Sequence, residues 1–378
     1  MEILKPKKSV YIHIPFCAGK CRYCDYFTVK DKNGYIYKYL ESIKKEASFY
    51  RGQEIKTIYI GGGTPSLLDC PQFEKLIEII EKNFDYSASD VEFSLELNPD
   101  SINEEKLRMY KENGVNRITI GIQSFNDKIL NFLGRIYSVK KARQSIEFSM
   151  KYFKNINIDL LFAIPEIQKL TDIENDLQIA GAYEFPHIAI YNLVIENRTY
   201  FHWLMKNNKI SEIDDELYEK EYKLINSILT SKNYVHYELS SFAKKGFECR
   251  HNLTYWRNQE YIGLGAGAHS YISGKRFWNV KFPSEYIIKI SENKSAVEDY
   301  EILESQARLG ETIMLRLHLE EGVDIDEVSR EFKINFKEKF SEELEKLLSD
   351  EYIIIKDNII RLTLKGKLFA NVAARSFL

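Results

Sequence analysis

The sequence predicts an α/β fold in which parallel strands are joined by helices, followed by a smaller helix-plus-hairpin domain. From residue 9 to about residue 191, short β-branched runs alternate with longer stretches of helical period, which is the pattern of crossover connections. The length of 378 residues and the apolar content of 44% allow one large domain and a smaller one. Periodicity alone leaves two architectures open, a doubly wound open sheet and an incomplete barrel.

Six strands are expected in the first part of the chain, at residues 10–14, 55–61, 91–97, 117–122, 156–162 and 187–193. Helices are expected between them, among others at 35–49, 72–83, 103–113 and 139–152. After residue 215 a helical stretch leads into an aromatic-rich region, 234–278. Past about residue 293 the chain reads as charged helix, then as two short strands, 352–355 and 359–362, and then as a final helix. We therefore expect three domains, 1–230, 231–295 and 296–378, of which the last is winged-helix-like.

The charge balance gives no support for a polyanionic partner. There are 53 basic and 56 acidic side chains, and the net charge of -3 is too small to argue for nucleic acid or an anionic membrane surface. No stretch approaches the ~20 apolar residues that a membrane-spanning helix needs. These observations fit a cytoplasmic protein that binds its ligands at local sites.

Three closely spaced cysteines form the most informative motif. Cys17, Cys21 and Cys24 follow the first expected strand with the spacing CxxxCxxC, whereas Cys70 and Cys249 stand alone. Thiolates are soft ligands, so this spacing indicates an iron–sulfur cluster or zinc before a disulfide framework. Structural zinc needs four ligands, and no further cysteine lies nearby. We predict a 4Fe-4S cluster with one iron left open; the alternatives are three-ligand zinc and cysteines that bind no metal.

Two further features predict a ligand at the carboxyl ends of the strands. Residues 61–66 read GGGTPS, and successive glycines let the backbone approach a ligand closely. No Gly-Lys-Ser/Thr follows, so a phosphate-binding loop is a poor interpretation, and a plain turn is the alternative. Polar residues also end or interrupt three later strands, and each alone is compatible with a paired core residue: Glu96, Asn98, Gln123, Ser124 and Asp159. Together with Arg135 they suit a ligand that has hydroxyls, a carboxylate and an amine.

The residues around the cysteines resemble the radical S-adenosylmethionine (SAM) superfamily. The match rests on residues 11–17, YIHIPFC, and 21–26, CRYCDY. The resemblance implies a partial (β/α)6 barrel, with the cluster on the three cysteines and SAM on the open iron. In that superfamily, one-electron reduction of the sulfonium yields methionine and a 5′-deoxyadenosyl radical.

Further motifs are similar to the oxygen-independent coproporphyrinogen oxidase family over nearly the whole chain. They are GVNR at 114–117, GIQSFN at 121–126, LGRI at 133–136, NIDL at 157–160, YE at 237–238, SFA at 241–243 and GLGAGAHS at 263–270. By resemblance, the positions that contact SAM are Tyr11, Gly62, Gly63, Thr64, Glu96, Gln123, Arg135 and Asp159. The chain departs from the family at residues 163–166, AIPE, where relatives usually have GLPG. It also has Tyr137 where one branch commonly has histidine.

That family contains a decarboxylating dehydrogenase of porphyrinogen synthesis and a haem chaperone. The dehydrogenase carries a cysteine two places after the third cluster ligand, where this chain has Tyr26, and a long amino-terminal extension, whereas here 16 residues precede Cys17. Residues 251–256 match the HNxxYW motif that is associated with haem in the chaperone. The resemblance implies a carrier that binds haem as cargo and passes it to an acceptor such as a respiratory haem protein. The alternative is an oxygen-independent coproporphyrinogen III dehydrogenase, which would be an oxidoreductase.

The HNxxYW segment is chemically suited to haem. An imidazole such as that of His251 can ligate iron axially, and Tyr255 and Trp256, with Asn252 beside them, offer flat apolar area for a macrocycle. The plain alternative is that these side chains pack in a core. His269, in a Gly-Ala-Gly-Ala setting, is a second candidate ligand, although its small neighbours also suit close backbone packing.

Overall fold

The computed structural model describes residues 7–31 and 34–378, and its first part contains the expected parallel sheet. Six consecutive parallel strands lie side by side in the order β1-β2-β4-β5-β6-β7. Their bounds are β1 Lys8–Ile14, β2 Gln53–Gly62, β4 Glu92–Leu97, β5 Arg117–Gln123, β6 Asn155–Phe162 and β7 His187–Asn192. All six predicted strands are confirmed, with ends that differ by at most two residues. A two-residue strand, β3 Phe84–Asp85, pairs with the start of β2.

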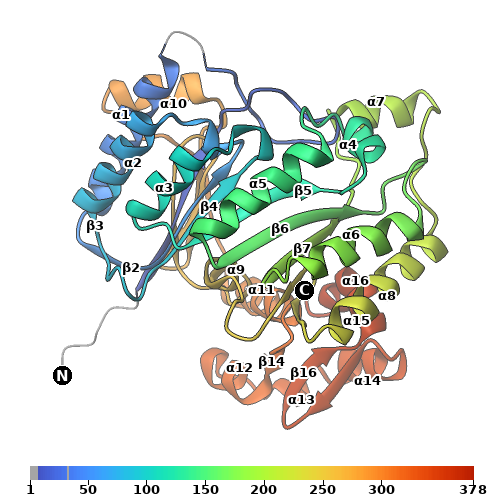
Figure 1. Ribbon diagram of the computed structural model, residues 1–378. Coiled ribbons are helices and arrows are strands. Elements are labelled where there is room, and N and C mark those ends of the chain that lie inside the picture. Colours follow the sequence, from blue (N-terminus) through green and yellow to red (C-terminus); the bar gives the residue numbers. More distant parts are fainter. Residues whose placement is uncertain (1–6, 32–33) are drawn as a thin grey trace. The chain divides into compact units, whose positions relative to one another are not determined.

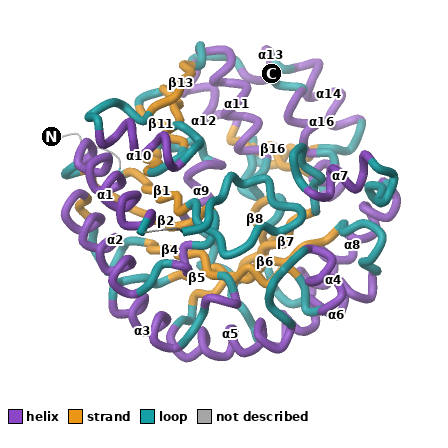
Figure 2. The backbone as a smooth tube through the Cα atoms, turned by 90° about the horizontal axis from the view of Figure 1, so that it is seen from above, coloured by secondary structure: helices purple, strands orange, loops and turns teal. Residues whose placement is uncertain are grey.

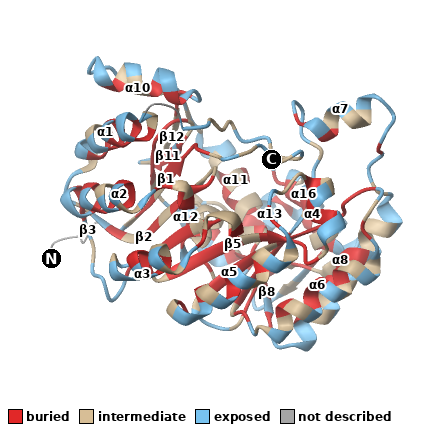
Figure 3. Ribbon diagram, turned by 45° about the horizontal axis from the view of Figure 1, so that its top comes forward, coloured by how far each residue is buried: buried red, intermediate tan, exposed pale blue. Residues whose placement is uncertain are grey.

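Helices lie along the outer side of this curved row of strands (Figure 2). They are α1 Tyr35–Ala47, α2 Cys70–Asn83, α3 Glu104–Glu112, α4 Asp127–Leu133, α5 Val139–Tyr152, α6 Leu170–Ala182 and α7 Tyr200–Lys206. The beginning of α2 is fixed by a capping box, in which the side chains of Asp69 and Gln72 each accept from the other's backbone N–H. Figure 3 shows that α1 and α2 bury one face and expose the other, as amphipathic helices on a sheet do.

Beyond β1 the sheet continues with strands from much later in the sequence. β10 Tyr261–Leu264 pairs in parallel with β1, and β11 His269–Ile272, β12 Lys275–Asn279 and β13 Val297–Ile302 follow in order. Between β12 and β13 the chain forms α10 Pro283–Ser291. The buried carboxylate of Glu46 in α1 secures this return, because it accepts from the backbone N–H of Gly265 at 2.8 Å and from the side chains of Asn279 and Tyr286 at 2.6 Å.

By their internal contacts the residues form two compact units that alternate along the sequence. The first runs to Asp214 and resumes over Glu260–Glu301, and the second comprises Asp215–Gln259 and Ile302–Leu378. The expected domains 1–230, 231–295 and 296–378 do not coincide with these units and stay a prediction. The reason for the difference is β10, which returns to β1 and thereby divides the aromatic-rich region between the two units.

The second unit has a core of its own and contains the expected helix-plus-hairpin module. Its first segment forms α8 Asp215–Ser231, the antiparallel pair β8 Val235–Glu238 and β9 Ser241–Ala243, and α9 Arg250–Trp256. Its second segment (orange to red in Figure 1) forms α11 Ser305–Leu317, β14 Val323–Asp324, α12 Ile325–Phe332, α13 Phe336–Lys339, α14 Ser341–Ser349, β15 Ile353–Lys356, β16 Ile359–Leu362, α15 Leu364–Leu368 and α16 Ala370–Arg375.

The carboxyl-terminal hairpin is confirmed by its pairing and by its turn. β15 and β16 pair antiparallel, and β14 adds to the outer side of β16. Asp357 and Asn358 have φ values of 54° and 58°, which a two-residue hairpin turn requires and which these residue types tolerate. Apolar side chains from α11 to α16 pack together beneath it, among them Ile313, Phe336 and Phe377.

Over the described residues, we find no helix with the length and apolarity that crossing a membrane requires.

Candidate functional site

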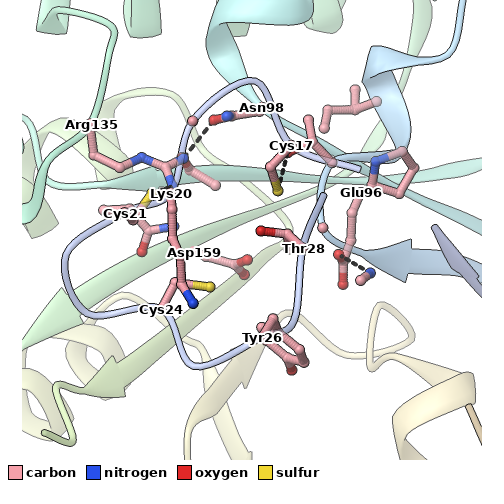
Figure 4. A pocket seen from close by; sticks show the side chains of 18 of the residues that line it. Cys17, Lys20, Cys21, Cys24, Tyr26, Thr28, Glu96, Asn98, Arg135 and Asp159 are labelled. Atoms are coloured by element: carbon pink, nitrogen blue, oxygen red, sulfur yellow. Dashed lines mark hydrogen bonds between the residues drawn. The ribbon is translucent and has the colours of Figure 1, made fainter. Parts of the chain in front are cut away.

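A cavity opens at the carboxyl ends of β2, β4 and β5, beside the loop that follows β1 (Figure 4). Its volume is about 820 Å³ when the open solvent at its mouth is included. All three clustered cysteines line it, together with seven of the eight predicted SAM-contacting residues: Gly62, Gly63, Thr64, Glu96, Gln123, Arg135 and Asp159. Tyr11 is not among the lining residues; its hydroxyl lies 2.9 Å from Nδ1 of His13.

The cysteine loop is closed at its base by backbone hydrogen bonds. The N–H of Cys17 donates to the carbonyl of Val29 at 3.0 Å, and the N–H of Val29 donates to the carbonyl of Pro15 at 2.8 Å. Inside the loop, the N–H of Cys24 donates to the carbonyl of Cys21 at 3.3 Å, which forms the turn between the second and third cysteines. The loop therefore presents three thiols from a fixed base beside the glycine-rich end of β2.

The arrangement of the three thiols suits a cluster of several iron atoms better than a single metal ion. In the part of the chain that the structure describes, no three His, Cys, Asp or Glu side chains converge as the ligands of a single metal ion do. In a 4Fe-4S cluster each thiolate binds a different iron, so such convergence is not required. Burial raises the pKa of the Cys17 and Cys24 thiols. A metal that binds these thiols must therefore displace their protons.

The glycine-rich segment after β2 packs directly against the cysteine loop because it lacks side chains. A Cβ on Gly63 would lie 2.8 Å from the carbonyl oxygen of Phe16 and 3.0 Å from Sγ of Cys17. Gly62 has φ 115°, and a Cβ there would lie 2.6 Å from the ring of His13. Burial lowers the pKa of His13 to about 4, so its imidazole is a neutral packing partner. The two glycines thus allow this segment to pack close to the cysteine loop, so the segment does more than form a plain turn.

Two carboxyl groups lie in the cavity wall. Glu96 accepts from the hydroxyl of Tyr59 at 2.8 Å and from the N–H of Gly62 at 3.1 Å, and Asp159 accepts from the amide of Asn157 at 2.7 Å. Burial raises the pKa of both groups, that of Asp159 to about 7 with a further contribution from the negative charge of Glu96. A cationic or hydroxyl-bearing ligand is the partner that such acceptors favour.

Arg135 connects the cysteine loop to two strand ends and to Tyr137. Its Nη1 donates to Sγ of Cys21 at 3.2 Å, and its Nη2 donates to Oδ1 of Asn98 at 2.5 Å and to the carbonyl of Gly121 at 3.0 Å (Figure 4). Its Nε donates to the hydroxyl of Tyr137 at 3.0 Å. Burial acts to lower the pKa of Arg135, but nearby phenol and thiol groups outweigh it and raise that pKa well above its usual value. A permanent positive charge therefore lies against one of the three thiols.

Backbone strain accompanies the site. The pairing of β5 with β6 shifts register between Gly121 and Gln123, and Gln123 has φ 68°; a bulge of this kind re-aims a side chain. Ala163 and Glu166, in the loop after β6, have φ values of 59° and 66°. A left-handed conformation costs a non-glycine residue roughly 1–2 kcal/mol, so this loop is strained.

Several side chains were not found by sequence reasoning or have a different place from the one expected. Lys20, Tyr23 and Thr28 line the cavity, and their only sequence signal is that they neighbour the cysteines. Tyr26, where the dehydrogenase has a cysteine, also lines it and is 62% exposed. Ser124 is fully buried away from the lining and accepts from the N–H of Asn126 at 3.1 Å, so it is a paired core residue.

The predicted haem residues of the HNxxYW motif lie on α9 in the second unit. His251 is buried, and its Nε2 lies 2.8 Å from the hydroxyl of Tyr255 with the rings edge to face. Asn252 and Trp256 are half-buried. His269 belongs to the first unit, where its ring stacks on Trp278, and it is exposed. The structure therefore places the four motif residues on one short helix, without His269.

Comparison with known proteins shows relationships over the whole chain. The radical SAM superfamily model matches residues 11–174, and the HemN C-terminal domain model matches residues 303–369. A Lactococcus lactis protein named heme chaperone HemW is 33% identical over 377 residues, with 100% of this chain and 98% of that protein covered. A Bacillus subtilis protein of the same name is 35% identical over 376 residues, with coverage of 98% and 99%.

A solved structure shows the same fold. Coproporphyrinogen III oxidase (HemN) from Escherichia coli, described as a radical SAM enzyme, superposes with a TM-score of 0.85. The superposition covers 98% of this chain and 90% of that one at 21% sequence identity. The partial-barrel arrangement and the carboxyl-terminal module expected from the sequence are thus those of a radical SAM fold.

Proposed function

This chain belongs to the HemW family within the radical SAM superfamily, and on that premise we propose that it is a haem chaperone, which binds haem and transfers it to acceptor haem proteins. The observation that carries the proposal is the similarity, over nearly the full length of both chains, to proteins named heme chaperone HemW. The aligned span covers 98% or more of this chain, so it extends over the first unit and the second. The proposed partners are haem itself and a haem-accepting protein, for example a respiratory one.

The cavity of the first unit is the proposed cofactor site. Cys17, Cys21 and Cys24 would hold the 4Fe-4S cluster, since they are the three thiols that line the cavity. When bound, the cluster supplies an electron for cleavage of the SAM sulfonium. The chain's own groups would bind and orient SAM: the glycine backbone next to the cysteine loop approaches it closely, and Glu96 and Asp159 accept from its amine and hydroxyls.

The second unit is the proposed haem-binding part. His251, Asn252, Tyr255 and Trp256 are the proposed haem residues, and their common helix α9 supports this assignment. Ligation of iron by Nε2 of His251 requires that its hydrogen bond with Tyr255 opens and that the buried ring becomes accessible. Breaking a typical hydrogen bond costs about 0.5–1.5 kcal/mol net, and exposing the buried ring adds to that cost.

Two assays on the same anaerobically reconstituted protein test the proposal. The first is a haem titration followed by transfer to apo-myoglobin as a probe acceptor. The second is incubation with coproporphyrinogen III, a reductant and SAM. Stoichiometric haem binding and transfer without protoporphyrinogen formation is the expected result. Robust protoporphyrinogen formation without haem transfer would assign the chain to the dehydrogenase function instead.

The cluster assignment has its own matched pair of variants. Cys24→Ala removes a thiol that lines the cavity, whereas Cys70→Ala removes one at the start of α2. We expect the first variant to lose iron, acid-labile sulfide and the brown colour of the reconstituted protein, and the second to keep them. Equal iron content in the two variants would show that Cys24 is not a cluster ligand.

A further inference from the structure

The seven histidines of the chain all lie in described residues, and most have ring nitrogens that are unavailable to a ligand. Those that are buried and have a hydrogen-bonded ring nitrogen are His13, His187, His236 and His251. His202 and His269 belong to the first unit and not to the unit that carries the HNxxYW helix. Iron binds an imidazole only through an available nitrogen lone pair, so His318 remains among the histidines of the second unit.

His318, at the end of α11 in the second unit, is already arranged as a metal-binding histidine. Its Nδ1 lies 2.7 Å from the carbonyl oxygen of Met314. A carbonyl only accepts, so Nδ1 carries the proton and Nε2 carries the lone pair. The ring is half-buried, and none of the described residues forms a hydrogen bond with Nε2. Metal-ligating histidines typically have their second nitrogen fixed in this way.

The ring of His318 stacks on Trp256, the last residue of the HNxxYW motif. Their centroids are 4.9 Å apart, and their planes differ by 23°. A ring stacked on the imidazole in this way fixes its orientation, as a preorganised metal ligand requires. The motif's tryptophan therefore contacts a histidine that lies about 60 residues further along the chain.

The segment that carries Trp256 is held firmly against α11 and the turn after it. Arg257 forms two hydrogen bonds with the carboxylate of Glu321, through Nε and Nη2, both at 2.7 Å. Asn258 donates to the hydroxyl of Thr312 at 3.1 Å. Trp256, Arg257 and Asn258 thus contact the same helix and the turn after it. These contacts hold Trp256 and His318 in a fixed arrangement, as a preorganised binding site requires.

We propose that His318, supported by Trp256, ligates the iron of haem through Nε2. The inference rests on the proposed chaperone function and deepens it by naming the residue that binds the cargo. His251 then has a positioning role, since its bond to Tyr255 orders α9. His318 needs no hydrogen bond to open before it binds iron, whereas His251 does.

The test is a haem titration of the full-length, cluster-loaded protein, read by absorption and electron paramagnetic resonance spectra of the haem. The variants are His318→Ala, His251→Ala and His269→Ala. The last is a matched control, because His269 also stacks on a tryptophan, at 5.5 Å and 26°. We expect His318→Ala to lose the histidine-ligated spectrum and to raise the Kd for haem at least by the roughly 10- to 100-fold that loss of a ligand's supporting residue costs metal sites. Added imidazole is expected to restore the spectrum.

A second variant at position 318 distinguishes loss of the iron ligand from loss of folding. His318→Cys is expected to replace the histidine signature with that of a thiolate-ligated haem. A circular dichroism spectrum equal to that of the wild type shows that the variant is folded. The inference is overturned if His318→Ala keeps the spectrum and Kd of the wild type, or if His251→Ala alone loses them; in both cases the chaperone function stands. A wild-type protein that binds no haem overturns the inference together with the proposed function.

Discussion

Gly63→Ala is expected to damage the cysteine loop through one methyl group. The added Cβ would lie 2.8 Å from the carbonyl oxygen of Phe16, about 0.6 Å closer than the 3.4 Å at which ordinary contact begins. It would also lie 3.0 Å from Sγ of Cys17 and from the carbonyl oxygen of Ile14. Two of these atoms belong to the backbone and cannot rotate away. A displacement of this size exceeds the ≈ 0.5 Å within which functional groups must be held, and overpacking of this kind costs about 1–3 kcal/mol.

Two measurements check this prediction, and a second glycine of the same cavity supplies the control. Iron and sulfide content after reconstitution reports on the cluster, and urea unfolding of the metal-free protein reports on stability. Gly19→Ala is the control, because the nearest atom to its Cβ would be Cγ2 of Ile136 at 3.8 Å, an ordinary contact. We expect the control to change the free energy of unfolding by less than about 0.5 kcal/mol. Equal iron content and equal stability of the two variants would refute the steric argument.

The remaining predictions concern two buried hydrogen-bond networks. Tyr137→Phe removes the acceptor of the Nε–H of Arg135, and we expect a loss of about 1–3 kcal/mol in the free energy of unfolding, measured by urea denaturation; an unchanged midpoint would contradict this role. Burial raises the pKa of Glu46 to about 7, so its contribution to stability is complete below about pH 4.5 and is lost as the pH rises through about 7. Glu46→Gln removes this dependence, and its unfolding free energy should vary less than that of the wild type between pH 5 and 8. Parallel curves would show that Glu46 does not titrate there.

The parallel strands could be predicted because each is a local feature of the sequence. Strands buried on both faces read as continuous β-branched runs, and residues 117–122 and 156–162 are of this kind. β10 and its neighbours gave no comparable signal, since β10 is four residues long and contains Gly263. Its pairing partner, β1, lies some 250 residues earlier, and nothing local in a sequence encodes such a pairing.

The same distinction between local and long-range signals applies to the candidate site. The cysteines were predicted as cluster ligands from spacing and ligand chemistry. Seven of the eight residues expected around SAM line one cavity, because parallel strands end at the same edge of the sheet. The role of Tyr137 was not predictable, because its partner Arg135 is positioned by the carbonyl of Gly121 and by Asn98, which come from two different strand ends. Only the folded chain brings these groups together.

The positions at which the chain departs from ordinary structural preferences are concentrated around this cavity. Gln123 has a left-handed backbone conformation, and Glu96 and Asp159 are carboxyl groups whose pKa values burial raises. Each feature is unfavourable for the metal-free fold by itself. They persist together beside three thiols and the permanent charge of Arg135. A fold that only needed to be stable would place apolar side chains at these positions, so the arrangement is explained by what binds there.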